Sequence, residues 1–185
     1  MKLPLILLLF CFCLDCIATT RYEAVLTLKK LQERTRDGLR YQEFVELWKD
    51  TDCRVGGYLD RMEEGREDRT TLSMQRVMNH YGFAKMVWDY KFAGPEFKDF
   101  IVAESALGCK ILEKYPEIKK ETSAGEVIDW IPNTRVAGIR IEAAVGVIFM
   151  KASMELSELF RMMHGEHDES EFVHQTTGYP KDRGR

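Results

Sequence analysis

Apolar residues recur at intervals of three and four along most of the chain, which is the spacing of one face of an α-helix. The longest such run covers about 135–163. β-branched residues cluster at 139–141 and 145–149, but they fall within this spacing instead of alternating as in a half-buried strand. The pattern therefore predicts an all-α fold.

Turn residues divide the earlier part of the chain into shorter expected helices. Gly38 follows a first amphipathic run, and Gly56-Gly57 follows a second one over 41–48. Pro95 is placed as the first residue of a further helix, where its fixed φ is tolerated. The polar stretch 122–125 is expected to be a hinge between two halves of one helical domain.

The first segment, 1–18, has the layout of a secretory signal peptide. Lys2 precedes an apolar core over 3–14, and small residues precede a plausible cleavage point before Thr19. The apolar core is too short for a stable membrane span, although an uncleaved anchor is the alternative. We therefore predict a secreted, extracellular protein with no integral membrane span after cleavage.

The mature chain is expected to form a single α-helical domain over 19–175, followed by a flexible tail over 176–185 that is rich in charges, glycine and proline. The formal net charge is −3, and basic residues are interspersed with acidic ones. This distribution argues against nucleic acid or an anionic membrane surface as the partner, since both require a basic surface. It leaves the oligomeric state open.

Removal of the leader leaves two cysteines, Cys53 and Cys109. In an oxidising compartment a single pair usually bonds, so we predict a disulfide between them. Two buried free thiols are the alternative.

A search for catalytic and metal-binding residues finds one cluster, His164 and His167 with the neighbouring acids Glu166, Asp168 and Glu169. Gly165 weakens the helix there, and the spacing differs from that of the HExxH zinc motif, so a solvated helix end is the better interpretation. No nucleophile elbow, P-loop or dinucleotide fingerprint occurs. We predict no catalytic, cofactor-binding or metal-binding residues and no enzymatic activity.

Two parts of the chain match each other. The pattern of acids and apolar residues over 43–57 returns over 126–138, and each copy ends with Arg-Val-small-Gly. Downstream, 83–87 and 95–97 are echoed in the same order by 160–164 and 170–172. We interpret this as two degenerate helical repeats, packed into one bundle or a partial capsule around an apolar cavity. Repeat one would cover about 41–122 and a shortened repeat two about 123–175, with chance similarity as the alternative.

These motifs resemble the insect allergen-related repeat family, which includes cockroach group 1 allergens, midgut microvillar proteins and nitrile-specifier proteins. The carriers are 44–48 and 127–132, together with the Phe83 and Phe160 segments and the Glu-Phe pairs at 96–97 and 171–172. The resemblance implies a secreted all-α protein that holds fatty acyl ligands in an apolar cavity, often in the gut. Lys49 replaces the family's usual proline and the second copy is short, so a smaller cavity or a solid bundle is an alternative.

The expected function is therefore binding of fatty acids or other apolar small molecules in the gut lumen. Arg54 or Arg135 is placed near a head group, on the basis of their matched positions in the repeat. The alternatives are a secreted structural or interaction protein of the gut surface, or a product-diverting protein similar to the nitrile-specifier branch. The residues predicted to line the ligand are Phe83, Met86, Phe97, Phe100, Trp130, Phe149 and Phe160.

Overall fold

A computed structural model describes residues 19–63, 68–93, 96–119 and 127–175, with side chains described as far as His164 in the last helix. The predicted signal peptide, the predicted hinge and the predicted tail lie outside the described residues. The fold is mostly helical, as the spacing of apolar residues predicts.

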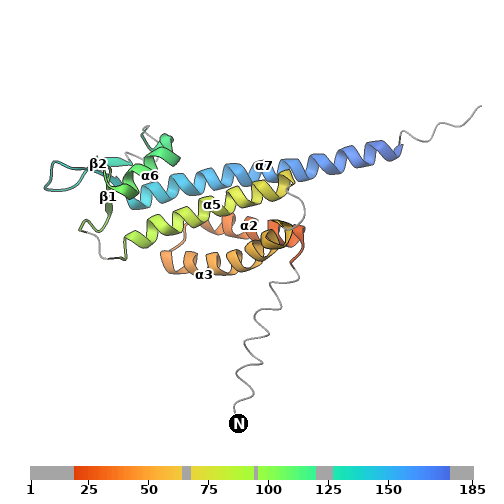
Figure 1. Cartoon of the computed structure of the whole chain (residues 1–185), viewed down its shortest axis with the longest axis horizontal. Helices are drawn as coiled ribbons and strands as arrows, with labels where there is room; N and C mark the ends of the chain where they lie inside the picture. Colours follow the sequence, from red (N-terminus) through yellow and green to blue (C-terminus); the bar gives the residue numbers. More distant parts are fainter. Residues whose placement is uncertain (1–18, 64–67, 94–95, 120–126, 176–185) are drawn as a thin grey trace, which may run out of the picture.

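The longer helices run along the long axis of the molecule (Figure 1). Helix α5 runs toward the end that carries a small sheet, and α7 starts at that end and runs back beside it. Helices α2 and α3 pack against each other and against the α5–α7 pair. A π-helical segment, η1, joins α3 to the short helix α4. The helices are α2 (Arg21–Arg36), α3 (Tyr41–Thr51), η1 (Asp52–Gly56), α4 (Gly57–Glu63), α5 (Arg69–Tyr90) and α7 (Ile141–Gln175).

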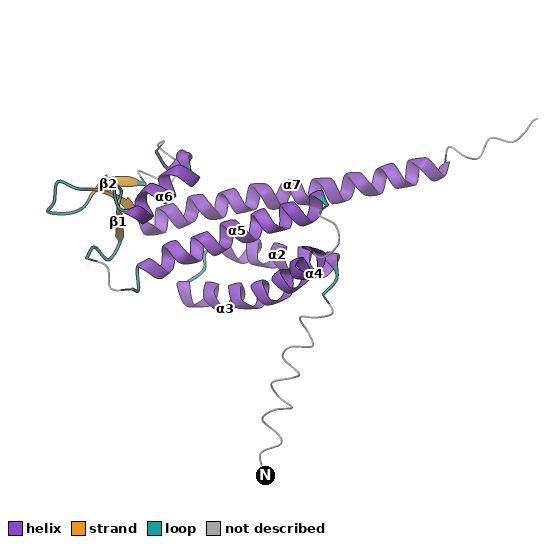
Figure 2. Ribbon diagram, viewed as in Figure 1, coloured by secondary structure: helices purple, strands orange, loops and turns teal. Residues whose placement is uncertain are grey.

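A small three-stranded antiparallel sheet corrects the all-α prediction (Figure 2). The strand order is β1-β3-β2, and Ile101 of β1 pairs with Ile139 of β3. Helix α6 and a 3₁₀ turn, η2, follow β1 along the chain. The elements are β1 (Phe100–Val102), α6 (Ala106–Lys114), η2 (Pro116–Lys119), β2 (Ile128–Trp130) and β3 (Ala137–Arg140).

Two sequence predictions fail at this sheet. The segment after Pro95 was expected to be helical, but it contains β1, and the helix that follows begins only at Ala106. The long run over 135–163 begins with β3, and α7 starts at Ile141. A helical spacing cannot reveal this, because β3 is held by hydrogen bonds to β2 and to β1, and β1 is distant in the sequence.

The helix starts follow local capping chemistry. The Thr20 side chain accepts a hydrogen bond from the Glu23 amide, and the Glu23 carboxylate accepts one from the Thr20 amide, which forms a capping box. Asp68 caps α5 by accepting from the Thr71 amide at 2.7 Å. After α2, Gly38 has a φ of 87°, which is the left-handed conformation that glycine tolerates best.

The core is continuous from the helices to the sheet. Phe44, Tyr81 and Leu156 are fully buried between α3, α5 and α7, while Ile101 and Ile139 extend the same core beneath the sheet. Bulky side chains therefore fill the space between the main helices, which favours the solid-bundle alternative over a capsule.

The predicted repeat is not seen in the part of the chain that the structure describes. Residues 43–51 are helical within α3, whereas the matching segment 126–138 contains β2, a loop and the start of β3. Asn133 in this loop has a φ of 62°, which is a turn conformation with no counterpart in α3. Because the same pattern of acids and apolar residues fits both structures, it did not identify a duplicated unit.

The predicted disulfide is also wrong. Cys109 lies on α6 as an exposed free thiol, so Cys53 and Cys109 are not bonded to each other. Cys53 belongs to η1, which packs against α2, α3, α4 and α5, whereas α6 packs against β1 and η2.

Candidate functional site

The seven residues predicted to line a ligand do not surround one cavity. Phe149 belongs to the packed core, with its ring centre 5.1 Å from that of Phe44. Trp130 is 65% exposed on β2 of the small sheet. Phe97 lies just before β1, and Phe100 is the first residue of β1. Phe160 is covered by the Lys29 ammonium group, 5.5 Å from the ring centre. Four hollows that described residues line open to solvent.

Two of the predicted residues, Phe83 and Met86, do line one hollow together. We call this hollow of about 320 Å³ the α5 groove. Its floor lies on α5, and one wall comes from α3 and η1. The lining residues are Trp48, Asp52, Met78, Asn79, Gly82, Phe83 and Met86.

Gly82 keeps this groove open above the indole of Trp48. A Cβ atom at position 82 would lie 3.5 Å from the Trp48 ring, which is ordinary van der Waals contact. The absence of a side chain therefore exposes apolar ring surface inside the groove without any strain in the helix.

Two lysines of α6 lie beside the groove, over Phe83, which is one of its lining residues, and we call this pair the lysine wall. The ammonium groups of Lys110 and Lys114, on α6, lie 5.8 and 4.6 Å from the ring centre of Phe83. These are cation–π distances. Neither lysine forms an ion pair with any residue that the structure describes. Burial, with a further contribution from the charge of Lys110, lowers the pKa of Lys114 below its ordinary value.

The helical geometry of α5 places Trp48 and the lysine wall on different sides of the helix. Consecutive helix residues are about 100° apart around the axis, so Gly82 faces Trp48 while Phe83 turns toward α6. On that side the Nδ1 atom of His80 lies 2.8 Å from the Tyr115 hydroxyl, just beyond the end of α6. The α5 groove thus has an apolar floor and Asp52 in its lining, and the lysine wall lies next to it, over Phe83.

The surroundings of His80 lower its pKa. Burial lowers its pKa most strongly, and the nearby charge of Lys114 lowers it further. Tyr115 is fully buried, and burial raises the pKa of its hydroxyl. The His80–Tyr115 contact is therefore formed between neutral groups, and it holds the lysine-bearing segment against α5.

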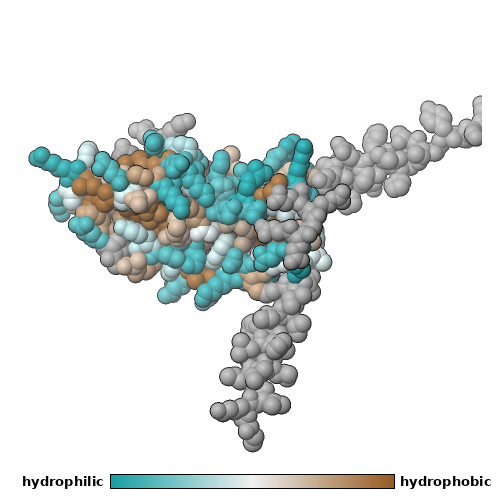
Figure 3. Space-filling model, viewed as in Figure 1, coloured by the Kyte–Doolittle hydropathy of each residue, from teal (hydrophilic) through white to brown (hydrophobic). Residues whose placement is uncertain are grey.

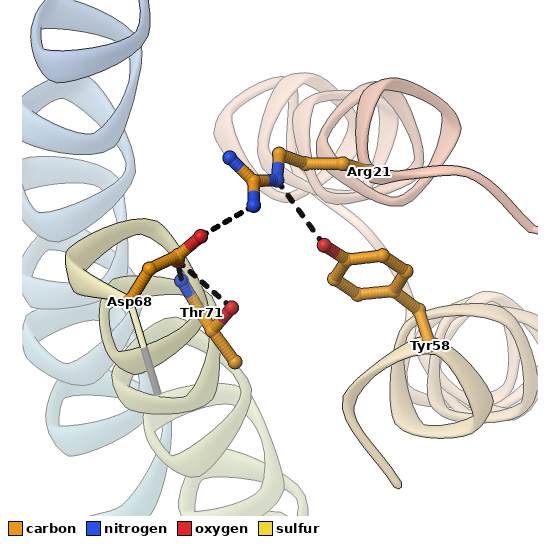
Figure 4. Close-up of polar contacts among 4 residues, drawn as sticks. All are labelled: Arg21, Tyr58, Asp68 and Thr71. Atoms are coloured by element: carbon orange, nitrogen blue, oxygen red, sulfur yellow. Dashed lines mark hydrogen bonds and ion pairs between the residues drawn. The ribbon is translucent and has the colours of Figure 1, made fainter. Parts of the chain in front are cut away.

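A second polar cluster, at the other end of α5, has a structural role (Figure 4). Arg21 of α2 donates from Nε to the Tyr58 hydroxyl at 3.2 Å and forms an ion pair with Asp68. Burial alone would raise the pKa of Asp68, but hydrogen bonds from Thr71 and the charge of Arg21 lower it below its usual value. This cluster joins α2, α4 and the start of α5 and leaves no group free for chemistry.

The remaining sequence candidates do not form a reactive site. In the described part of the chain, no group of three histidine, cysteine or acidic side chains is placed to hold a metal. His164 is exposed on α7, and the side chain of His167 lies outside the described residues. Arg54 is paired with Asp50 at 2.9 Å, and Arg135 is exposed in the loop before β3, so they do not share a site.

No described helix is both long and apolar enough to cross a membrane. The chain matches no family model, and it shows no significant similarity to curated proteins or to solved structures. The resemblance to the insect allergen-related repeat family remains a prediction from the sequence.

The lysine wall next to the α5 groove is the feature that sequence reasoning missed. Lys110 and Lys114 are four residues apart on an amphipathic segment, which places them on one helix face. The sequence does not show that this face lies over Phe83, because the contact joins segments about 30 residues apart.

Proposed function

We propose that this protein is a helical binding module that holds an amphipathic anion, such as a fatty acid, in the α5 groove. The observation that supports this most is the position of Lys110 and Lys114 over Phe83, with no ion-pair partner among the described residues. An anionic head group would meet both ammonium groups, and an apolar tail would lie along the floor of the groove.

The floor suits an apolar tail. Trp48, Phe83 and Met86 offer ring and thioether surface, and methionine adapts to ligands of irregular shape. Each CH₂ group that is covered contributes about 0.8 kcal/mol, and an open groove covers only part of each group. We therefore propose modest affinity for chains of medium length, at a surface groove instead of the interior cavity expected from the sequence.

The proposed role is binding without catalysis, in an extracellular setting. The setting is supported only by the predicted signal peptide, which lies outside the described residues. The charges near the groove would also orient the ligand, since the Asp52 carboxylate repels an anionic head group and the lysine wall attracts it.

A fatty-acid titration tests the proposal directly. Decanoate should displace a fluorescent fatty acid from the wild-type protein, and Lys114→Gln should weaken decanoate binding on the order of fivefold. Lys98→Gln is the matched control, because this lysine is exposed and lies outside the groove. Equal affinities of the two variants would contradict a role for the lysine wall.

A second candidate function is protein interaction through the sheet end of the molecule. Trp130 is 65% exposed and Phe92 58% exposed, which is unusual for large aromatic side chains. Figure 3 shows hydrophobic residues gathered among hydrophilic ones at this end. Trp130→Ser should then abolish attachment to a surface partner while decanoate binding stays unchanged, which separates the two functions.

A further inference from the structure

His80 places a titratable group beside the lysine wall. It lies one helical turn before Phe83, so the two side chains share a face of α5. The Tyr115 ring centre is 5.6 Å from that of His80 and 5.4 Å from that of Phe83. The Lys114 ammonium group lies 4.6 Å from the ring centre of Phe83 and 5.8 Å from that of Tyr115. The imidazole therefore belongs to the aromatic cluster that the lysine wall covers.

The described charges that face His80 lie on α6, α7 and η2. Lys114 of α6 and Lys151 of α7 repel a proton on the imidazole, whereas Glu117 of η2 and Glu155 of α7 attract one. Burial lowers the pKa of His80 most, and Lys114 has the largest effect among these charges. In the free protein the lysine wall therefore opposes protonation of its neighbour.

The contact with Tyr115 is compatible with both charge states of His80. A hydroxyl group both donates and accepts hydrogen bonds, so it can donate to the neutral ring or accept from the Nδ1–H of the charged ring. His80 is also only half-buried. Protonation therefore adds a positive charge beside the lysine wall without removing the contact that holds the end of α6.

We propose that anion binding in the α5 groove is coupled to uptake of one proton from solvent by His80, an inference that rests on the proposed function. An anionic head group at Lys110 and Lys114 offsets the positive charge that opposes protonation, so the bound state favours the imidazolium form. Because coupling between two binding events is reciprocal, a protonated His80 strengthens anion binding by the same factor. The protein would then load its ligand in an acidic surrounding and release it in a neutral one.

The expected size of the coupling follows from Coulomb's law. Opposite unit charges on the order of 7 Å apart in water change an equilibrium constant on the order of threefold. We therefore expect the affinity for an anionic amphiphile to rise on the order of threefold as the pH falls from about 7.5 to about 5.

The test uses octyl sulfate as the probe, because its head group stays ionised over this pH range, and 1-octanol as its uncharged match. Imidazole NMR follows the titration of His80 in the wild-type protein, and the ¹³C-methyl signal of Met86 reports whether the groove is occupied. Saturating octyl sulfate should raise the proton affinity of His80 on the order of threefold. Saturating 1-octanol should leave it unchanged. The imidazole signal of His164, exposed on α7, is the internal reference.

Three variants separate the contributions. His80→Gln keeps a hydrogen-bonding group near Tyr115 but does not titrate, so its affinity for octyl sulfate should change less with pH than that of the wild-type protein. Lys114→Gln should raise the proton affinity of His80 in the absence of any ligand, since it removes the repelling charge. Lys98→Gln is the matched control and should not, because Lys98 is exposed and lies outside the groove.

The coupling would be overturned by a His80 titration that octyl sulfate does not move, by an equal effect of 1-octanol, or by the same pH dependence of affinity in His80→Gln. A saturable shift of Met86 with an unmoved His80 titration would refute the coupling and leave the proposed binding function standing. A Met86 signal that responds to octyl sulfate at neither pH would refute both. The NMR titration uses the wild-type chain, so it decides even if His80→Gln alters the fold.

Discussion

The Nδ1 atom of His80 and the hydroxyl of Tyr115 lie 2.8 Å apart, and this contact fastens the end of α6 to α5. The adjacent Lys114 reaches over Phe83 from the same segment. The position of the lysine wall therefore depends on this contact, and the folded state favours the neutral form of His80.

This dependence predicts a loss of stability in mild acid. The pKa of His80 is lowered in the folded state, first by burial and then by Lys114, below its value of about 6.5 in the unfolded chain. The unfolded state therefore binds the proton more readily, so the contribution is present above about pH 6.5 and is lost as the pH falls through the folded-state pKa.

Urea unfolding at about pH 7.5 and about pH 5 measures this effect. The wild-type protein should lose more stability between these conditions than His80→Gln, which does not titrate. Parallel losses in the two proteins would show that His80 does not contribute.

Substitution of two glycines by alanine should have opposite effects. At Gly108 of α6 the new Cβ would lie 2.2 Å from the Val102 carbonyl oxygen, so backbone must move, and we expect a loss of about 2–3 kcal/mol. At Gly146 of α7 the Cβ meets open space, and the better helix propensity of alanine should add about 0.5–1 kcal/mol.

Denaturation midpoints of the two glycine variants check this pair. A tolerated Gly108→Ala would contradict the close packing of α6 on the end of β1.

Two substitutions at Asp68 should lower the free energy of unfolding by different amounts. Asp68→Ala removes both the cap of α5 and the ion-pair partner, and we expect a cost of about 1–2 kcal/mol. Asp68→Asn keeps an oxygen for the cap, so it should lose only the exposed ion pair, worth less than about 1 kcal/mol. Equal unfolding free energies for the two variants would indicate that the cap contributes little.

The free thiol of Cys109 gives a chemical test of the corrected disulfide prediction. Because this residue is exposed, iodoacetamide should modify it in the folded protein without prior reduction. Peptide mass mapping identifies the labelled cysteine. A Cys109 that is protected until a reductant is added would mean that it is bonded.

The sequence predicted the elements whose structure depends on residues close together in the chain. The spacing of apolar residues predicts α2 and α3, and Gly38 ends the first of these helices as expected. It fails where long-range pairing decides, as at Ile139, whose partner Ile101 is 38 residues away along the chain.

The candidate site shows the same division. Phe83 and Met86 were predicted as ligand-lining residues, and the structure places both in the α5 groove. Phe149 was predicted for the same reason but packs in the core, because aromatic residues suit both environments. The contribution of Lys110 and Lys114 depends on how α6 docks, which no local pattern encodes.

The most direct test of the central claim is a decanoate titration monitored at the Met86 methyl group. The account predicts a saturable shift of Met86 in the wild-type protein that is absent in Gly82→Leu, where the new side chain fills the α5 groove. A Met86 signal that stays in place, or one that shifts equally in Gly82→Leu, would contradict the claim.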